Sequence, residues 1–159
     1  MKSVGRCCIK TLVVYDLLYG NTKTIAQAIG GAIPGEVAVR HVAQVQAGDV
    51  ASADLLIVGS PTHGALPTRA VQNLLERIGS PAREDVQAAT FDTRLTWGFL
   101  ERWGGFAAPK MAATLREKGW TVTGAPSGFF VRGLKKGPLR HGEAERAVAR
   151  AKGLLGNDE

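Results

Sequence analysis

The residues best placed to do chemistry form a short turn at 15–22, which reads Tyr-Asp-Leu-Leu-Tyr-Gly-Asn-Thr. The turn follows a β-rich apolar run at 9–15 and precedes a helical pattern at 25–33. Asn21 and Thr22 are residue types that begin helices well. A helix start offers unpaired N–H groups and the positive end of the helix dipole, so this turn predicts an anion site.

The glycine pattern of the turn narrows the kind of anion. A P-loop needs GxxxxGK followed by Ser or Thr, and the turn lacks that pattern. The dinucleotide-binding pattern GxGxxG is missing as well, because Gly20 is the single glycine between residues 15 and 22. Both of these nucleotide-binding interpretations are therefore weakened.

Alternating strands and helices must position the turn. Apolar or β-rich runs predict strands at 9–15, 37–42, 55–58, 86–91 and 120–131, the last interrupted at 124–128. Periodic apolar residues predict helices at 25–33, 71–78, 108–118 and 143–155, with a short helix in the loop at 43–53 and further loops at 60–67 and 92–105. This alternation predicts right-handed βαβ units, a parallel sheet and the α/β class.

Four segments in the same order resemble the flavodoxin family. The turn at 15–22 resembles the family's FMN-phosphate loop in its Tyr-Gly-Asn-Thr variant. Residues 57–64 resemble its third strand and the flavin loop that follows, and 91–95 resemble the start of its second flavin loop. Residues 142–147 resemble the opening of its last helix. The resemblance implies a flavodoxin-like three-layer αβα sandwich with a five-stranded parallel sheet in the order 2-1-3-4-5.

The same resemblance implies where FMN would be bound. The residues expected at the phosphate are Leu18, Tyr19, Gly20, Asn21 and Thr22. Those expected at one edge of the isoalloxazine are Pro61, Thr62, His63 and Gly64, where glycine would permit a peptide flip beside the flavin N5. Those expected on the other side are Asp92, Thr93, Arg94, Trp97 and Gly98, with Trp97 as the candidate for stacking on the ring. No residue is assigned a catalytic or metal-binding role.

One position departs from the family pattern. Leu17 stands where the family usually has a Ser or Thr hydroxyl that donates to the phosphate. Loss of one hydrogen bond to a charged group costs about 1.5–3 kcal/mol, or roughly a tenfold to hundredfold loss of affinity. We still expect FMN to bind, although a weak site would not tolerate the loss.

The charge of the chain is basic, with a formal net charge of +6. Electron-carrying members of the family are typically acidic, so this charge predicts a redox partner with an acidic docking surface. Cationic Arg69 and Arg94 beside the flavin loops would favour the anionic hydroquinone and make its potential less negative. A basic cluster at 132–141 carries no interleaved aromatic residues, and nucleic acid is therefore not the expected partner.

The remaining composition is that of an ordinary globular domain. Apolar residues make up 45% of the 159 residues and charged residues 21%. We expect one flavodoxin-like domain over 1–159, with 1–8 as a loose N-terminal extension. Lys10 and Asp16 interrupt the first apolar run, so we expect neither a signal peptide nor a membrane span and predict a cytoplasmic protein. Adjacent Cys7 and Cys8 are interpreted as free thiols.

Three functions fit this sequence. The first is an FMN protein that acts in electron transfer. The second is an FMN-dependent NAD(P)H/quinone-type reductase, which would need open space over the face of the flavin. The third is a flavodoxin fold that has lost FMN and serves as an interaction module. The electron carrier is favoured over a stand-alone oxidoreductase, although one fold hosts many functions.

Overall fold

A computed structural model describes residues 9–16, 20–62, 66–95, 105–131 and 138–156. The strands of its sheet are β1 Lys10–Tyr15, β2 Glu36–His41, β3 Leu55–Pro61, β4 Gln87–Leu95, β5 Thr121–Val122 and β6 Ser127–Val131. Neighbouring strands run parallel in the order β2-β1-β3-β4-β5, and β6 also pairs with β4. The predicted strand order 2-1-3-4-5 is therefore confirmed.

The fifth position of the sheet is divided between two strands. β5 pairs with residues 87–88 of β4, and β6 pairs with residues 91–95 of the same strand. Between them, the Thr123 N–H still donates to the Ala88 carbonyl over 2.7 Å, and Gly124 adopts a φ of +69°. The interruption predicted at 124–128 is thus a local break in one continuing edge of the sheet.

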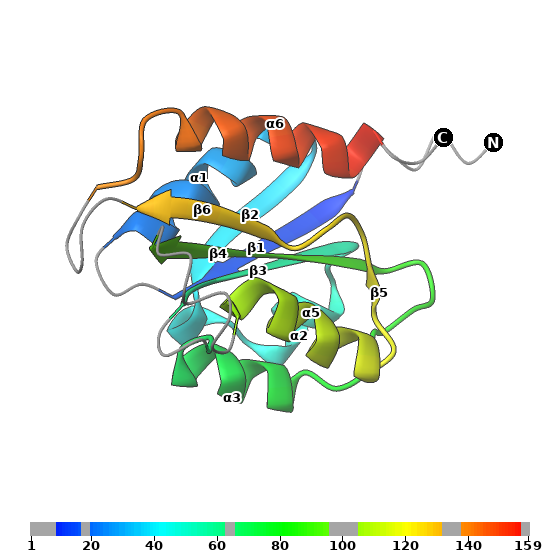
Figure 1. The fold of residues 1–159 in the computed structure, drawn as a ribbon. Helices are drawn as coiled ribbons and strands as arrows, with labels where there is room; N and C mark the ends of the chain where they lie inside the picture. Colours follow the sequence, from blue (N-terminus) through cyan, green and yellow to red (C-terminus); the bar gives the residue numbers. More distant parts are fainter. Residues whose placement is uncertain (1–8, 17–19, 63–65, 96–104, 132–137, 157–159) are drawn as a thin grey trace.

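Helices cover both faces of the sheet (Figure 1). On one face lie α1 Asn21–Ala32 and α6 Glu143–Gly156. On the other lie the 3-10 helix η2 Val42–Gln44, α2 Ala47–Ala51, α3 Arg69–Arg77 and α5 Ala107–Glu117. These elements form the three layers that the sequence predicts.

The central strand shows why the sequence folds into layers. Every residue of β3 is buried, and its apolar side chains divide between the two faces of the sheet. Leu56 and Val58 belong to the core under α3 and α5, whereas Leu55 and Ile57 belong to the core under α1 and α6. A continuous apolar run thus supplies both cores, because successive side chains on a strand point to opposite faces.

The fourth strand is longer than predicted. The sequence predicts a loop from residue 92, but Asp92, Thr93 and Arg94 lie within β4, paired with β3 or β6 on either side. The prediction of a loop there is wrong because a polar stretch can remain in a central strand once its charges are paired. Similarly, β3 runs through Ser60 to Pro61, beyond the predicted start of a loop at residue 60. In the part of the chain that is described, no helix has the length and apolarity to cross a membrane.

Candidate cofactor site

Among the described residues, the start of α1 is open, and its first turn carries no negative charge. Gly20 precedes the helix with a φ of +89°, a conformation that glycine adopts at little cost. A side chain at Gly20 would find no described atom within 4 Å, and the first turn of α1 contains no acidic residue. The first N–H groups of a helix and its dipole attract an anion, so this start fits a phosphate group.

Two threonine hydroxyls connect the start of α1 to the end of β4. Thr22 Oγ1 lies 2.8 Å from Thr93 Oγ1, and both residues are buried. Two hydroxyl groups carry two protons, and the hydrogen bond between them uses one. When Thr93 is the donor, the Thr22 proton is left to donate to an oxygen at the start of α1.

The ends of β3 and β4 are joined to the start of α5. The Thr62 N–H donates to the Thr93 carbonyl over 2.9 Å, which continues the pairing beyond β3. The Thr62 hydroxyl accepts the Ala107 N–H over 3.0 Å. The first N–H of α5 is therefore held by the side chain of the residue that follows β3 rather than by a residue of its own turn.

Asp92 and Arg94 form a buried ion pair at the same place. Both carboxylate oxygens of Asp92, which is fully buried, accept hydrogen bonds of 2.6 Å from the Arg94 guanidinium. Asp92 Oδ2 also accepts the Ala108 N–H over 2.8 Å. Burial raises the pKa of Asp92, and the bonds from Arg94 and the Ala108 N–H oppose that rise.

The Arg94 side chain is held on its other sides as well. Its Cζ atom lies 3.7 Å from the centre of the Phe106 ring, within the range of a cation–π contact. A Cβ atom on Gly128 would lie 2.2 Å from the same Cζ, so only glycine leaves room for this guanidinium. The charge of Arg94 is therefore balanced by Asp92, whereas Arg69, exposed at the first residue of α3, has no carboxylate partner among the described residues.

The predicted site residues fall into two groups. Those that are described lie at one end of the sheet, where β1, β3 and β4 finish and α1 begins: Gly20, Asn21, Thr22, Pro61, Thr62, Asp92, Thr93 and Arg94. The others lie outside the described residues: Leu18, Tyr19, His63, Gly64, Trp97 and Gly98, together with the departure at Leu17. The first group thus shares the edge at which parallel α/β sheets bind ligands.

Sequence analysis missed a histidine at this edge. His41 Nε2 lies 3.1 Å from Asp16 Oδ1, and His41 Nδ1 accepts the Ala43 N–H over 3.1 Å. Because Nδ1 accepts, the ring proton is on Nε2, where it donates to Asp16. The Tyr15 ring meets the His41 ring edge-on, with centroids 5.6 Å apart. The one available signal was that β1 and β2 finish side by side, which places Tyr15 opposite His41.

The fold defines a doubly wound α/β protein, and the predicted site residues lie at the edge where the strand order reverses, the place at which such folds bind ligands. A family model described as a flavodoxin domain matches residues 12–93, slightly more than half of the 159 residues. The chain therefore belongs to the flavodoxin family, and this family implies FMN as the cofactor. A search of curated protein sequences finds no match.

Solved structures agree on the fold. The chain is similar to a flavodoxin from the domain Archaea, with 20% identity, a TM-score of 0.74, and coverage of 93% of this chain and 97% of that one. Flavodoxin 1 from Bacillus cereus gives 17% identity, a TM-score of 0.75, and coverage of 94% and 99%. The rubredoxin oxygen:oxidoreductase of Desulfovibrio gigas gives 17% identity and a TM-score of 0.71; 96% of this chain aligns with 37% of that one.

The described residues fit the phosphate end of FMN. The start of α1 has no described atom in the space beside Gly20 and no acidic residue in its first turn. By contrast, the Asp92 carboxylate and the Thr62 hydroxyl already accept hydrogen bonds from the start of α5. The fit therefore lies at the phosphate turn, whereas Asp92 holds the surrounding framework together.

Proposed function

We propose that this chain binds FMN at the start of α1 and acts as an electron carrier for a partner protein. The observation that carries the proposal is the open, uncharged helix start at Gly20, at the carboxyl edge of a flavodoxin sheet. When bound, FMN would supply the redox chemistry. Asn21, Thr22 and the backbone N–H groups of the first turn would hold its phosphate.

Three features of the chain support retention of an anionic group at this edge. Lys23 is exposed in the first turn of α1, and Arg69 is exposed at the first residue of α3. The Thr22–Thr93 pair can direct one hydroxyl proton toward the start of α1. Together these groups would offset part of the binding free energy that is lost because Leu17 has no hydroxyl to donate to the phosphate.

The visible absorption spectrum of the purified protein tests the proposal. The protein is measured before and after incubation with excess FMN followed by desalting. A retained flavin spectrum, with the released flavin identified as FMN, is the expected result. A colourless protein that retains no flavin would exclude the carrier and leave the interaction module, the candidate that Leu17 favours.

A second assay separates the carrier from a reductase. The FMN-loaded protein is mixed with NAD(P)H and a quinone, and NAD(P)H oxidation is followed without an added reductase. We expect no turnover above the rate of free FMN. Steady turnover would mean that the site admits its own small substrates, and the reductase would replace the carrier.

The charges near the site also bear on the flavin potential. Arg94 is paired with Asp92, so its effect on a nearby anion is small, and Arg69 remains as the exposed cation on α3. We still expect a less negative hydroquinone potential than an acidic flavodoxin shows, because nearby positive charge favours the anion. In a redox titration, Arg69→Gln should make the potential more negative, whereas Lys152→Gln, on α6, should not.

A further inference from the structure

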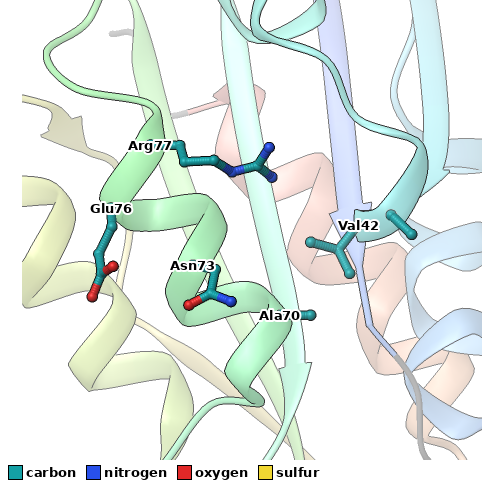
Figure 2. Close-up of a pocket in the computed structure, with 6 residues that line it drawn as sticks. Val42, Ala70, Asn73, Glu76 and Arg77 are labelled. Carbon is teal, nitrogen blue, oxygen red and sulfur yellow. The ribbon is translucent and has the colours of Figure 1, made fainter.

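A hollow on the surface separates α3 from η2. Its volume is about 470 Å³, and it is lined by Val42, Ala43, Ala70, Asn73, Glu76 and Arg77. Val42 and Ala43 form the η2 side of the hollow, and Ala70 forms its end at the first turn of α3. Asn73 and Arg77 line it further along α3 (Figure 2). Figure 2 shows Arg77 extending toward the η2 side, whereas Glu76 lies on the other side of the helix.

Three exposed arginines lie on the elements that border this hollow, and one of them, Arg77, lines it. Arg69 immediately precedes Ala70, and Arg77 lines the far end of α3. Arg40 lies two residues before Val42, and it faces the same side of β2 as Ala38, which packs against the core under α3. Within the described residues, none of these three side chains makes an ion pair or a hydrogen bond.

Three other arginines of the described residues are engaged with the protein itself, whereas Arg116, on α5, and Arg140 are exposed like those near the hollow. Arg83 pairs with Asp54 and Asp85, Arg94 with Asp92, and Arg146 with Glu143. Guanidinium groups bind carboxylates strongly through paired hydrogen bonds, so an arginine that lines the hollow, with two more on the elements that border it, indicates a surface for an acidic group. Among the described residues, Glu76 is the one carboxylate that lines the hollow, and Figure 2 shows its side chain directed away from that of Arg77.

The hollow begins close to the proposed cofactor. Its Ala70 end lies in the first turn of α3, at the edge of the sheet where β3 finishes. Leu66, which is 46% exposed, is the one large apolar residue that stands exposed in the described part of the chain, and it precedes this turn. An apolar contact beside charged groups is the usual composition of a protein interface.

We propose that the α3–η2 hollow, with Arg40, Arg69 and Arg77, docks an acidic segment of the redox partner; this inference rests on the proposed function. The net charge of +6 favours an acidic partner, and the arginines place the contact on the α3 side of the cofactor edge. Single-stranded nucleic acid is bound by aromatic side chains that stack on its bases, and no aromatic side chain is among the described residues that line the hollow.

NMR titration tests this docking site. The ¹⁵N-labelled protein, with FMN added, is titrated at low salt with cytochrome b5, an acidic electron-transfer protein, and in parallel with basic cytochrome c. We expect amide shifts in η2 and α3 with cytochrome b5 only, and loss of binding as salt rises, because exposed charges are screened. Shifts centred on other elements, or equal shifts with cytochrome c, would overturn the proposal.

Charge reversals sharpen the test. Arg77→Glu and Arg40→Glu should each weaken cytochrome b5 binding about threefold to tenfold, because each replaces an exposed attraction by a repulsion. Lys152→Glu, an equal charge change at an exposed site on α6, is the matched control and should leave binding within about twofold. Equal weakening in the control would show that only net charge matters and would overturn a docking site at the hollow.

The two proposals fail in different ways. Protein that loses FMN on desalting but still binds cytochrome b5 at the hollow would exclude the carrier and keep the docking site. Protein that retains FMN but whose binding of cytochrome b5 does not depend on the arginines would keep the carrier and exclude the docking site. A single-stranded oligonucleotide that displaces cytochrome b5 from α3 and binds more tightly would assign the hollow to nucleic acid instead.

Discussion

Two helices, α1 and α5, begin at the same edge of the sheet, and their first turns are treated in opposite ways. The start of α5 is closed by the chain itself, since the Thr62 hydroxyl accepts the Ala107 N–H and the Asp92 carboxylate accepts the Ala108 N–H. The start of α1 has a glycine before it and no acidic residue in its first turn. A closed start stabilises the fold, whereas an open one can hold an external anion.

The closed start predicts the largest effect on stability. Asp92→Ala would leave the Arg94 guanidinium, whose side chain is 13% exposed, without its partner. Breaking a buried ion pair from one side costs about 3–5 kcal/mol. Urea unfolding of the variant should therefore show a loss of this size in the free energy of unfolding.

An exposed ion pair provides the control for this loss. Asp85→Ala removes a partner of Arg83 at a site where both side chains are largely exposed, and stability should hardly change. Asp92→Asn, which keeps an acceptor for the Ala108 N–H, should lie between the two. If Asp92→Ala unfolded at the same urea concentration as Asp85→Ala, the closed start would contribute nothing to stability.

The open start predicts the largest effect on cofactor binding. Asn21→Asp introduces a carboxylate of the same shape at the first residue of α1. The phosphate should then bind about fivefold to several hundredfold more weakly, because two unit charges 4 Å apart repel by about 1–4 kcal/mol between water and a protein surface. Quenching of FMN fluorescence during titration measures the dissociation constant.

The same variant should be no less stable without FMN. An acidic residue in the first turn interacts favourably with the helix dipole and stabilises the helix by about 0.3–1 kcal/mol. Weaker FMN binding together with equal or greater stability would separate an anion site from a structural cap. Asn73→Asp, at an exposed position in α3, is the matched control and should leave FMN affinity unchanged. Tight FMN binding by Asn21→Asp would mean that the phosphate is held elsewhere.

The positions of most elements could be predicted from local patterns. The apolar run at 55–58 marks β3, and the spacing of Val71, Leu74 and Leu75 marks the buried face of α3. The turn proposed to hold the phosphate could also be located, because its residues are adjacent in the chain and lie between one strand and one helix. These features depend on contacts that a short window of sequence contains.

The closed start of α5 could not be predicted in this way. Asp92, Thr93 and Arg94 look like a loop, because three polar residues follow an apolar strand. They remain in β4 because Arg94 pairs with Asp92, Phe106 covers the guanidinium, and Gly128 leaves room for it. Phe106 and Gly128 come from elements beyond β4, so no local pattern of Asp92 and Arg94 indicates burial.

Paired threonine variants compare the two starts more finely. Thr93→Val removes the partner of the buried Thr22 hydroxyl at the open start. Thr90→Val removes a buried hydroxyl that donates to the Ala108 carbonyl over 2.9 Å at the closed start. Each should lower the free energy of unfolding by about 1–3 kcal/mol, because a buried polar group loses its partner.

Bound FMN should distinguish these two variants. With FMN present, the Thr22 hydroxyl can donate to the phosphate, so the loss in Thr93→Val should become smaller. The loss in Thr90→Val should stay the same with and without FMN, since the Ala108 carbonyl to which Thr90 donates lies at the closed start of α5. Thermal unfolding of both variants in each state measures the difference. Equal losses in all four samples would show that Thr22 does not face the phosphate.

The start of α6 extends the comparison to pH. Burial of Glu143 opposes its ionisation, but hydrogen bonds from Arg146 and the Phe130 N–H outweigh it and lower the pKa of Glu143. A lowered pKa in the folded state means that this stabilisation is complete above the ordinary glutamate value of about 4.3 and is lost as the pH falls below it.

Glu143→Gln should therefore have a small effect that depends on pH. The variant should be less stable than the wild type at pH 7 and should lose less stability between about pH 5 and pH 3, as urea unfolding at each pH would show. Glu145→Gln, at an exposed position in the same turn, is the control and should follow the wild type. If Glu143→Gln and the wild type lost stability in parallel, the carboxylate of Glu143 would not contribute to the acid sensitivity of α6. Of the starts of α1, α5 and α6, only that of α5 would then be a start that the chain stabilises by its own hydrogen bonds, in contrast to the open start of α1.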